Sequence, residues 1–171
     1  MIRNRIPRGV TDPAFARQAA PAEAAIVAAA YGVDTTVIYK IARDWLVDAA
    51  LMAGATGLDD VETAHHVESD HPKGWTGLLS DPYLLEADEI PGEARFSIVH
   101  AAREWLWDAS GAGVDAGHEF EALTTDELLQ QVRSSYDGGW LQFLADGNPD
   151  HQIHQTTTTM TTAHSAEGDP R

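Results

Sequence analysis

The fold of this chain depends on residues 21–44, which read PAEAAIVAAAYGVDTTVIYKIARD. Apolar side chains recur at helical spacing on both sides of Gly32, as they do in amphipathic helices. A glycine can adopt the left-handed backbone that ends a helix, and Asp34 or Thr35 can cap the next one. We therefore predict two helices joined by a tight turn. The apolar stripe of the second helix continues to just before Gly54 through Ile38, Ile41, Ala42, Trp45, Ala49 and Met52.

This pair has the residue types that a helix-turn-helix requires. Ala28 is small enough for two helices to cross, and Gly32 permits the turn. The residues that can lock the second helix onto the first are Val33, Ile38 and Ile41. An ordinary α-hairpin with a glycine cap fits the same spacing, and the long stripe favours a core helix. In a helix-turn-helix, the side chains opposite the two isoleucines face the bases of the major groove. They are Thr35, Thr36, Tyr39, Lys40 and Arg43.

Two stretches of the chain resemble known proteins. Residues 21–44 resemble the helix-turn-helix units of bacterial and phage DNA-binding proteins, a resemblance that implies DNA contact through the second helix. The opening NRIPRGV at residues 4–10, followed by Phe15 and Ala16, is similar to an opening shared by small actinobacterial and actinophage proteins. The Gly-Gly-Gln that usually precedes the phenylalanine is replaced by Asp12-Pro13-Ala14. This second resemblance implies an origin in a mobile element.

Charge is divided unevenly along the chain, whose formal net charge is −16. Residues 1–45 hold six basic and four acidic side chains, whereas the remainder holds five basic and 23 acidic ones. Arg5 and Arg8 lie in the N-terminal stretch, where they can add phosphate contacts to those of the helix-turn-helix. The acidic remainder of the chain repels a polyanion and attracts a basic partner.

The rest of the chain predicts one all-α domain over residues 12–146. Prolines that follow a capping residue predict helix starts at Pro13 and Pro82, and Pro21 predicts a separate start. A capping box of Thr124 and Glu127 predicts another helix. A further helix is expected between about residues 91 and 110, with Phe96 on its apolar stripe. Residues 1–11 should form a flexible basic arm and residues 147–171 a disordered tail.

A group of imidazoles and carboxylates after residue 64 could ligate a divalent metal. Its spacing matches no metal motif, so a solvated polar loop is the favoured interpretation. Its members are His65, His66, Glu68, Asp70 and His71.

Helical spacing also pairs His100 with Glu104, which could act as a base and its orienting carboxylate or form the polar edge of an amphipathic helix.

Most of the aromatic side chains after residue 104 should be buried, and Trp107 is the expected exception. No phosphate-binding glycine loop or nucleophile elbow occurs, and we expect neither catalysis nor a cofactor.

The leading functional hypothesis is a DNA-binding protein, either a transcriptional regulator or a mobile-element accessory protein, acting as a dimer through the helix-turn-helix. The first alternative is a non-catalytic protein-interaction module whose acidic surface mimics the charge of DNA. The second is a small metal-dependent hydrolase that uses the histidine group. The chain has no cysteine and no apolar run of membrane-spanning length, so we expect a cytoplasmic protein without a membrane partner.

Overall fold

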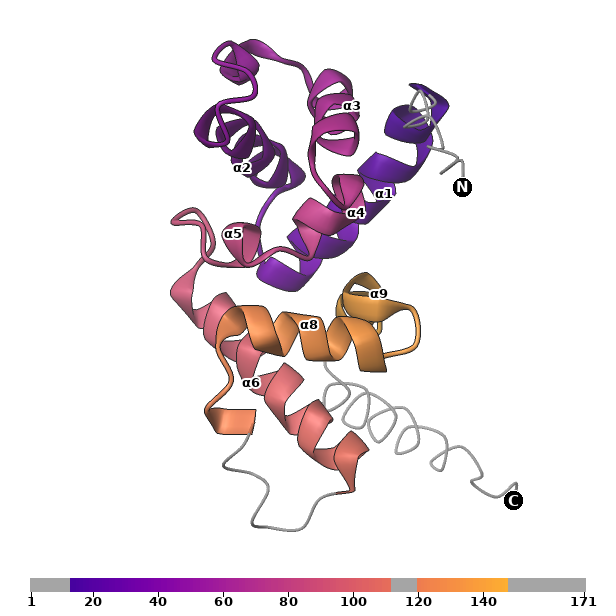
Figure 1. Cartoon of the computed structure of the whole chain (residues 1–171), viewed down its shortest axis with the longest axis vertical. Coiled ribbons are helices and arrows are strands. Elements are labelled where there is room, and N and C mark those ends of the chain that lie inside the picture. Colours follow the sequence, from indigo (N-terminus) through magenta and orange to yellow (C-terminus); the bar gives the residue numbers. More distant parts are fainter. Residues whose placement is uncertain (1–12, 112–119, 148–171) are drawn as a thin grey trace, which may run out of the picture.

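Helices joined by short capped turns make up the part of the chain that the structure describes (Figure 1). It is a computed structural model, and it describes residues 13–111 and 120–147. No β-strand occurs in those two ranges, so the prediction of a single all-α domain is confirmed. The helices are α1 (Pro13–Tyr31), α2 (Thr35–Asp48), the 3₁₀ turn η1 (Ala55–Gly57), α3 (Asp60–Asp70), α4 (Gly74–Leu79), α5 (Pro82–Leu85), α6 (Gly92–Ser110), α8 (Thr125–Ser135) and α9 (Gly139–Ala145).

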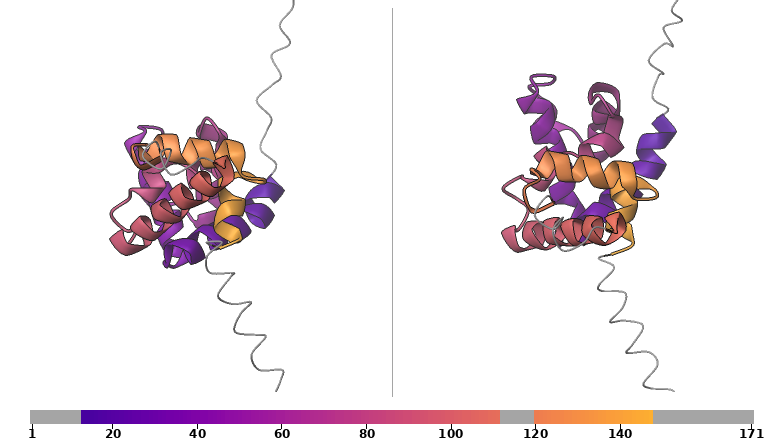
Figure 2. Two further views of the ribbon diagram at one scale, coloured as in Figure 1. Left: turned by 90° about the horizontal axis from the view of Figure 1, so that it is seen from below. Right: turned by 60° about the horizontal axis from the view of Figure 1, so that its bottom comes forward.

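Helix α1 is the centre of this arrangement, because it packs against α2, α3, α4, α6 and α9. Helices α2 to α5 lie on one side of it in Figure 1, and α6, α8 and α9 lie on the other. Figure 2 shows the second group from two further directions. The two sides share one continuous core. The contribution of α1 to that core consists of Ala20, Ala24, Val27, Ala28 and Tyr31.

Several helix boundaries follow from capping chemistry that the sequence predicts. Asp81 caps α5 by accepting a hydrogen bond from the backbone N–H of Tyr83 at 2.9 Å, with Pro82 at the first helical position. The predicted capping box of Thr124 and Glu127 begins α8, and both of its hydrogen bonds are present. Gly111 ends α6 in the left-handed conformation, with φ of 60°.

Two boundary predictions are wrong. Pro21 does not start a new helix but lies inside α1, because the continuous buried face of α1 offsets the one backbone hydrogen bond that a proline cannot donate. Helix α2 ends at Asp48 rather than near Gly54. Its C-terminus is closed by Ala50 in the left-handed conformation (φ 56°), with the backbone N–H of Leu51 bonded to Leu46 O at 3.1 Å.

The orientation of α6 also differs from the predicted one. Phe96, expected on the buried stripe, is 72% exposed, whereas Ile98 and Leu106 face the core. Trp107 is 40% exposed, so its prediction as the exposed tryptophan is confirmed.

The predicted basic arm and tail, apart from Gly147, and Arg5 and Arg8 with them, lie outside the described residues. Among the residues that are described, no single helix is both long enough and apolar enough to cross a membrane. Within the described part of the chain, one bent pair, Gln18–Tyr31 of α1 with Thr35–Asp48 of α2, reaches that length and composition when taken together.

Candidate functional site: the outer face of α2 and an acidic pocket

The turn between α1 and α2 places the two helix axes at 106° to each other. Gly32 adopts φ of 66°, and the backbone N–H of Val33 bonds to Ala28 O at 3.0 Å, which closes the end of α1. The side chain of Asp34 then accepts a hydrogen bond from the backbone N–H of Thr36 at 2.8 Å and caps α2. These local interactions direct α2 away from α1 and fix which of its side chains face outward.

The five α2 residues expected to face DNA do not share one exposed surface. Thr36 is exposed and Thr35 is half-buried. Tyr39 is only 5% exposed, because Trp75 of α4 stacks on its ring with the centroids 5.4 Å apart. The expectation that Tyr39 faces outward is therefore wrong. Tyr39 is thus covered by a tertiary contact that comes from α4.

Arg43 also points into the protein rather than away from it. Its side chain is 18% exposed, and its Nη1 donates to the backbone oxygen of Leu58 at 3.2 Å and to Oδ1 of Asp60 at 3.2 Å. A weaker contact of 3.5 Å reaches the hydroxyl of Thr63. This guanidinium joins α2 to the beginning of α3 through Nη1.

Lys40 is the exposed cation of α2, with 55% of its side chain accessible, but it is already paired. Its ammonium contacts Oδ2 of Asp44 at 2.7 Å, one turn further along α2. It also contacts Oε1 of Glu89 at 2.5 Å, which follows α5 in the chain. The two carboxylates, with Asp44 the stronger, raise the pKa of Lys40, and Lys40 in turn lowers the pKa of Glu89.

Three arginines outside α2, Arg95, Arg103 and Arg133, are likewise used inside the fold. Each donates from Nη2 to a backbone carbonyl of another segment. Arg95 bonds to Ala87 O at 2.9 Å, Arg103 bonds to Leu123 O at 3.2 Å, and Arg133 bonds to Ser80 O. These guanidiniums hold loops against helices, with Nη2 of each engaged inside the fold.

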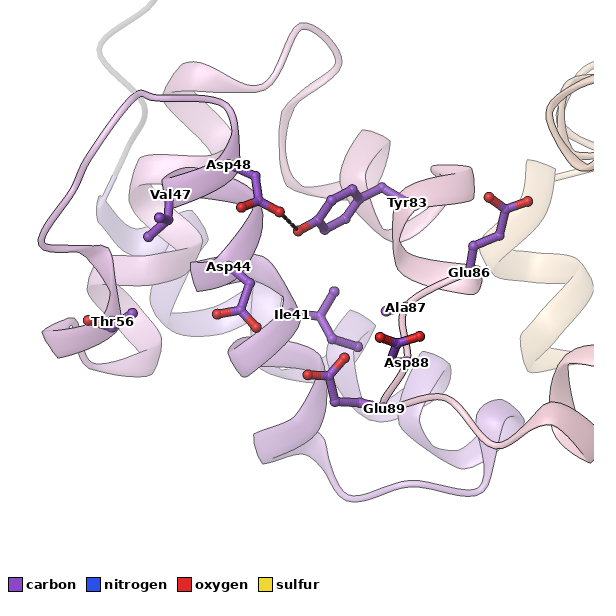
Figure 3. Close-up of a pocket in the computed structure, with 10 residues that line it drawn as sticks. All are labelled: Ile41, Asp44, Val47, Asp48, Thr56, Tyr83, Glu86, Ala87, Asp88 and Glu89. Carbon is purple, nitrogen blue, oxygen red and sulfur yellow. Dashed lines mark hydrogen bonds between the residues drawn. The ribbon is translucent and has the colours of Figure 1, made fainter.

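An acidic pocket of about 480 Å³ lies beside Lys40, between α2 and the segment that follows α5 (Figure 3). Its floor includes Ile41, and Asp48 accepts a hydrogen bond from the hydroxyl of Tyr83 at 2.7 Å. Burial, the hydrogen bond to Asp48 and nearby carboxylates raise the pKa of Tyr83, so the phenol stays protonated. The pocket carries five carboxylates, from Asp44, Asp48, Glu86, Asp88 and Glu89.

The sequence analysis did not single out these carboxylates, although part of the signal was present. Asp44 and Asp48 follow Lys40 at intervals of four, which places all three on one face of α2. Glu89 lies 49 residues from Lys40, and only the tertiary fold brings the two together.

The histidine group is not a loop, because its first four members lie on α3 and His71 caps that helix, and two of its members make contacts that stabilise the fold. Glu68 on α3 accepts a hydrogen bond from the backbone N–H of Trp75 at 2.6 Å. His71 is buried, with Nε2 3.7 Å from Oδ2 of Asp81. Among residues 18–111 and 120–147, no group of three or more His, Cys, Asp or Glu side chains is placed to hold a metal ion.

His100 and Glu104 do form the predicted pair on α6, with Nε2 and Oε1 3.1 Å apart. Both side chains are exposed, and the ring of Phe96 stacks on the imidazole with the centroids 5.9 Å apart. This is the geometry of a polar helix edge.

Comparison with known proteins adds no family to these observations. Searches of protein-family models, curated proteins and solved structures gave no match for this chain.

Proposed function

We propose that this protein is a non-catalytic interaction module whose acidic pocket on α2 binds a lysine- or arginine-bearing segment of a partner. The observation that carries the proposal is the position of Lys40. Its ammonium lies between Asp44 and Glu89 at the rim of the pocket. The same two carboxylates are therefore spaced to hold a cationic side chain supplied from outside.

The charge of the whole chain supports this proposal. A net charge of −16 raises the local concentration of a basic partner and accelerates its encounter with the pocket. The five pocket carboxylates supply a local negative field, and the hydroxyl of Tyr83 fixes one of them in place. A partner whose positive charge replaces that of Lys40 is thus attracted by the net charge of the chain at long range and by the pocket carboxylates at short range.

The test is a titration of the full chain with a peptide of eight alternating lysines and serines at low salt. Lys40→Met should tighten binding by about threefold, because it frees Asp44 and Glu89 from their internal cation. Asp44→Asn combined with Asp48→Asn should weaken binding by about tenfold. The matched control removes two charges elsewhere, with Asp70→Asn and Asp108→Asn, and should have a much smaller effect.

Equal losses in the pocket variant and the control variant would contradict the pocket as the site. Weaker peptide binding by Lys40→Met would contradict it as well, because the proposal makes Lys40 a competitor of the partner.

The angle between α1 and α2 favours a second proposal, DNA contact by the N-terminal turns of α2. Thr35, Thr36 and Lys40 would meet the DNA, with Arg5 and Arg8 adding phosphate contacts. Lys40→Met distinguishes the two proposals, because it should weaken DNA retention and reduce the log–log salt slope by about one unit. Unchanged retention would reject DNA contact by this face.

A further inference from the structure

A second cavity, of about 520 Å³, lies between α6 and the turn that joins α8 to α9. It is separate from the pocket on α2, and nothing in the function proposed above uses it. Two aromatic rings, three polar side chains and a glycine line it. They are Trp105, Tyr136, Asp137, Gly138, Gln142 and Asp146.

The two rings form a corner of the cavity. The centroids of Trp105 and Tyr136 are 4.9 Å apart, and their planes meet at 65°. Phe143 packs behind them, with its centroid 5.4 Å from that of Tyr136 and at 85° to it. The rings are therefore held by the core while they remain partly open to the cavity. The face of an indole or a phenol attracts a cation through its quadrupole.

Two carboxylates lie next to this corner, and the oxygens of the inner one are already engaged. Asp146 accepts a hydrogen bond from the hydroxyl of Tyr136 at 2.5 Å and another from Nε2 of Gln142 at 2.6 Å. Asp137 is exposed at the rim. The hydrogen bond to Asp146, burial and the charge of Asp137 together raise the pKa of Tyr136 to about 12, so the phenol remains a neutral donor to Asp146.

The two aromatic rings and the engaged inner carboxylate together favour one kind of cation. A primary ammonium or a guanidinium would have to exchange its water hydrogen bonds for acceptors, and each oxygen of the inner carboxylate, Asp146, already accepts a hydrogen bond from the protein. A quaternary ammonium has no N–H group, so it loses no hydrogen bond on entering and gains attraction from the rings and the carboxylates. We infer that the cavity between α6 and the α8–α9 turn is a binding site for a quaternary or fully methylated ammonium group.

The test follows the tryptophan indole N–H signals of the full-length, ¹⁵N-labelled protein by NMR during titration with small probes. Tetramethylammonium and choline should shift the Trp105 signal, with dissociation constants of about 1–10 mM. Methylammonium should bind at least about fivefold more weakly than tetramethylammonium. The uncharged isostere of choline, 3,3-dimethylbutan-1-ol, should bind at least about fivefold more weakly than choline.

Two variants complete the design. Trp105→Phe keeps a ring against Tyr136 and Phe143 but weakens the cation attraction, so choline binding, followed through the Tyr136 ring signals, should fall by about fivefold. The matched control is Trp107→Phe, two residues away on the outward side of α6, which should leave binding unchanged.

Three results would overturn the inference. One is the absence of a shift with either quaternary probe up to about 50 mM. Another is equal affinity for choline and its uncharged isostere, which would mean that the cavity binds apolar groups. The third is binding of methylammonium as tight as that of tetramethylammonium, which would mean that hydrogen bonding dominates. Because these three measurements use the unaltered protein, they do not depend on whether Trp105→Phe folds.

Discussion

Single residues carry unusual conformational and electrostatic roles in this fold, and Ala50 is the clearest example. It lies directly after the C-cap of α2 with φ of 56°, a conformation that glycine adopts without steric cost. Ala50→Gly should therefore raise the free energy of unfolding by about 0.5–1 kcal/mol, seen as a higher urea midpoint with an unchanged slope. Ala53→Gly, at an exposed site with no positive φ, is the control and should give no gain.

Glu23 on α1 should make the free energy of unfolding depend on pH, with a sign that follows from the direction of its pKa shift. Burial, and to a smaller extent the charge of Glu68, raise its pKa above 4.5, while the Thr76 hydroxyl opposes the shift. The folded state therefore binds the proton more tightly than the unfolded state. This residue should add stability as the pH falls through its folded pKa, with the full gain below the unfolded value.

Glu23→Gln should remove that contribution, so the stability of the variant should rise less on mild acidification than that of the original protein. Thr76→Val removes the opposing hydrogen bond and should make the rise larger. Urea unfolding at closely spaced pH values measures both. A Glu23→Gln profile parallel to that of the original protein would show that the carboxyl is solvated in the folded state.

Among the helices, contacts made by half-buried arginines hold the loops in place. The guanidinium of Arg133 on α8 donates to the backbone oxygen of Ser80, 53 residues away, at the turn between α4 and α5. Arg133→Met should cost about 1.5–3 kcal/mol, because it removes a charge-assisted hydrogen bond to a buried segment. Gln130→Met, on the exposed side of the same helix, should change stability by less than about 0.5 kcal/mol. Chemical denaturation of both variants gives the comparison.

Sequence signals predicted where some helices begin better than they predicted which helix faces are buried. The caps at Asp81 and Thr124 were readable because each depends on residues within four positions. The burial of Tyr39 could not be predicted in this way, because it depends on a tertiary contact with Trp75 of α4. Phe96 was misplaced because α6 has apolar residues on more than one face, and its packing against α1 and α8 buries the face that carries Ile98 and Leu106.

The candidate site likewise combines features that local sequence signals predict with contacts that only the tertiary structure makes. Lys40 was identified from the sequence, as were the helix that carries it and the turn before it. Its pairing with Glu89 depends on the path of the chain after α5, which no local pattern predicts. The acidic pocket on α2 is therefore a product of tertiary structure, even though Asp44 and Asp48 have readable helical spacing.

The molecule as a whole carries more like charge than its described ion pairs neutralise. Self-repulsion of this kind destabilises a compact state and is screened by salt. We expect the melting temperature at pH 7 to rise by several degrees, about 4–8 °C, between 20 and 300 mM NaCl. The gain should be smaller near pH 4, where carboxylates begin to protonate. A melting temperature independent of salt at pH 7 would show that opposite charges balance locally.

Helix α1 has a consequence for how the protein opens. It supplies one face to α2, α3 and α4 and another to α6 and α9, so neither group can detach without uncovering it. The backbone amides of its second half, around Val27 and Ala28, should exchange with deuterium only through complete unfolding. We expect the outer turns of α2 and α6 to open without it. The acidic pocket on α2 and the cavity beside α6 should thus fluctuate while the helix between them stays closed.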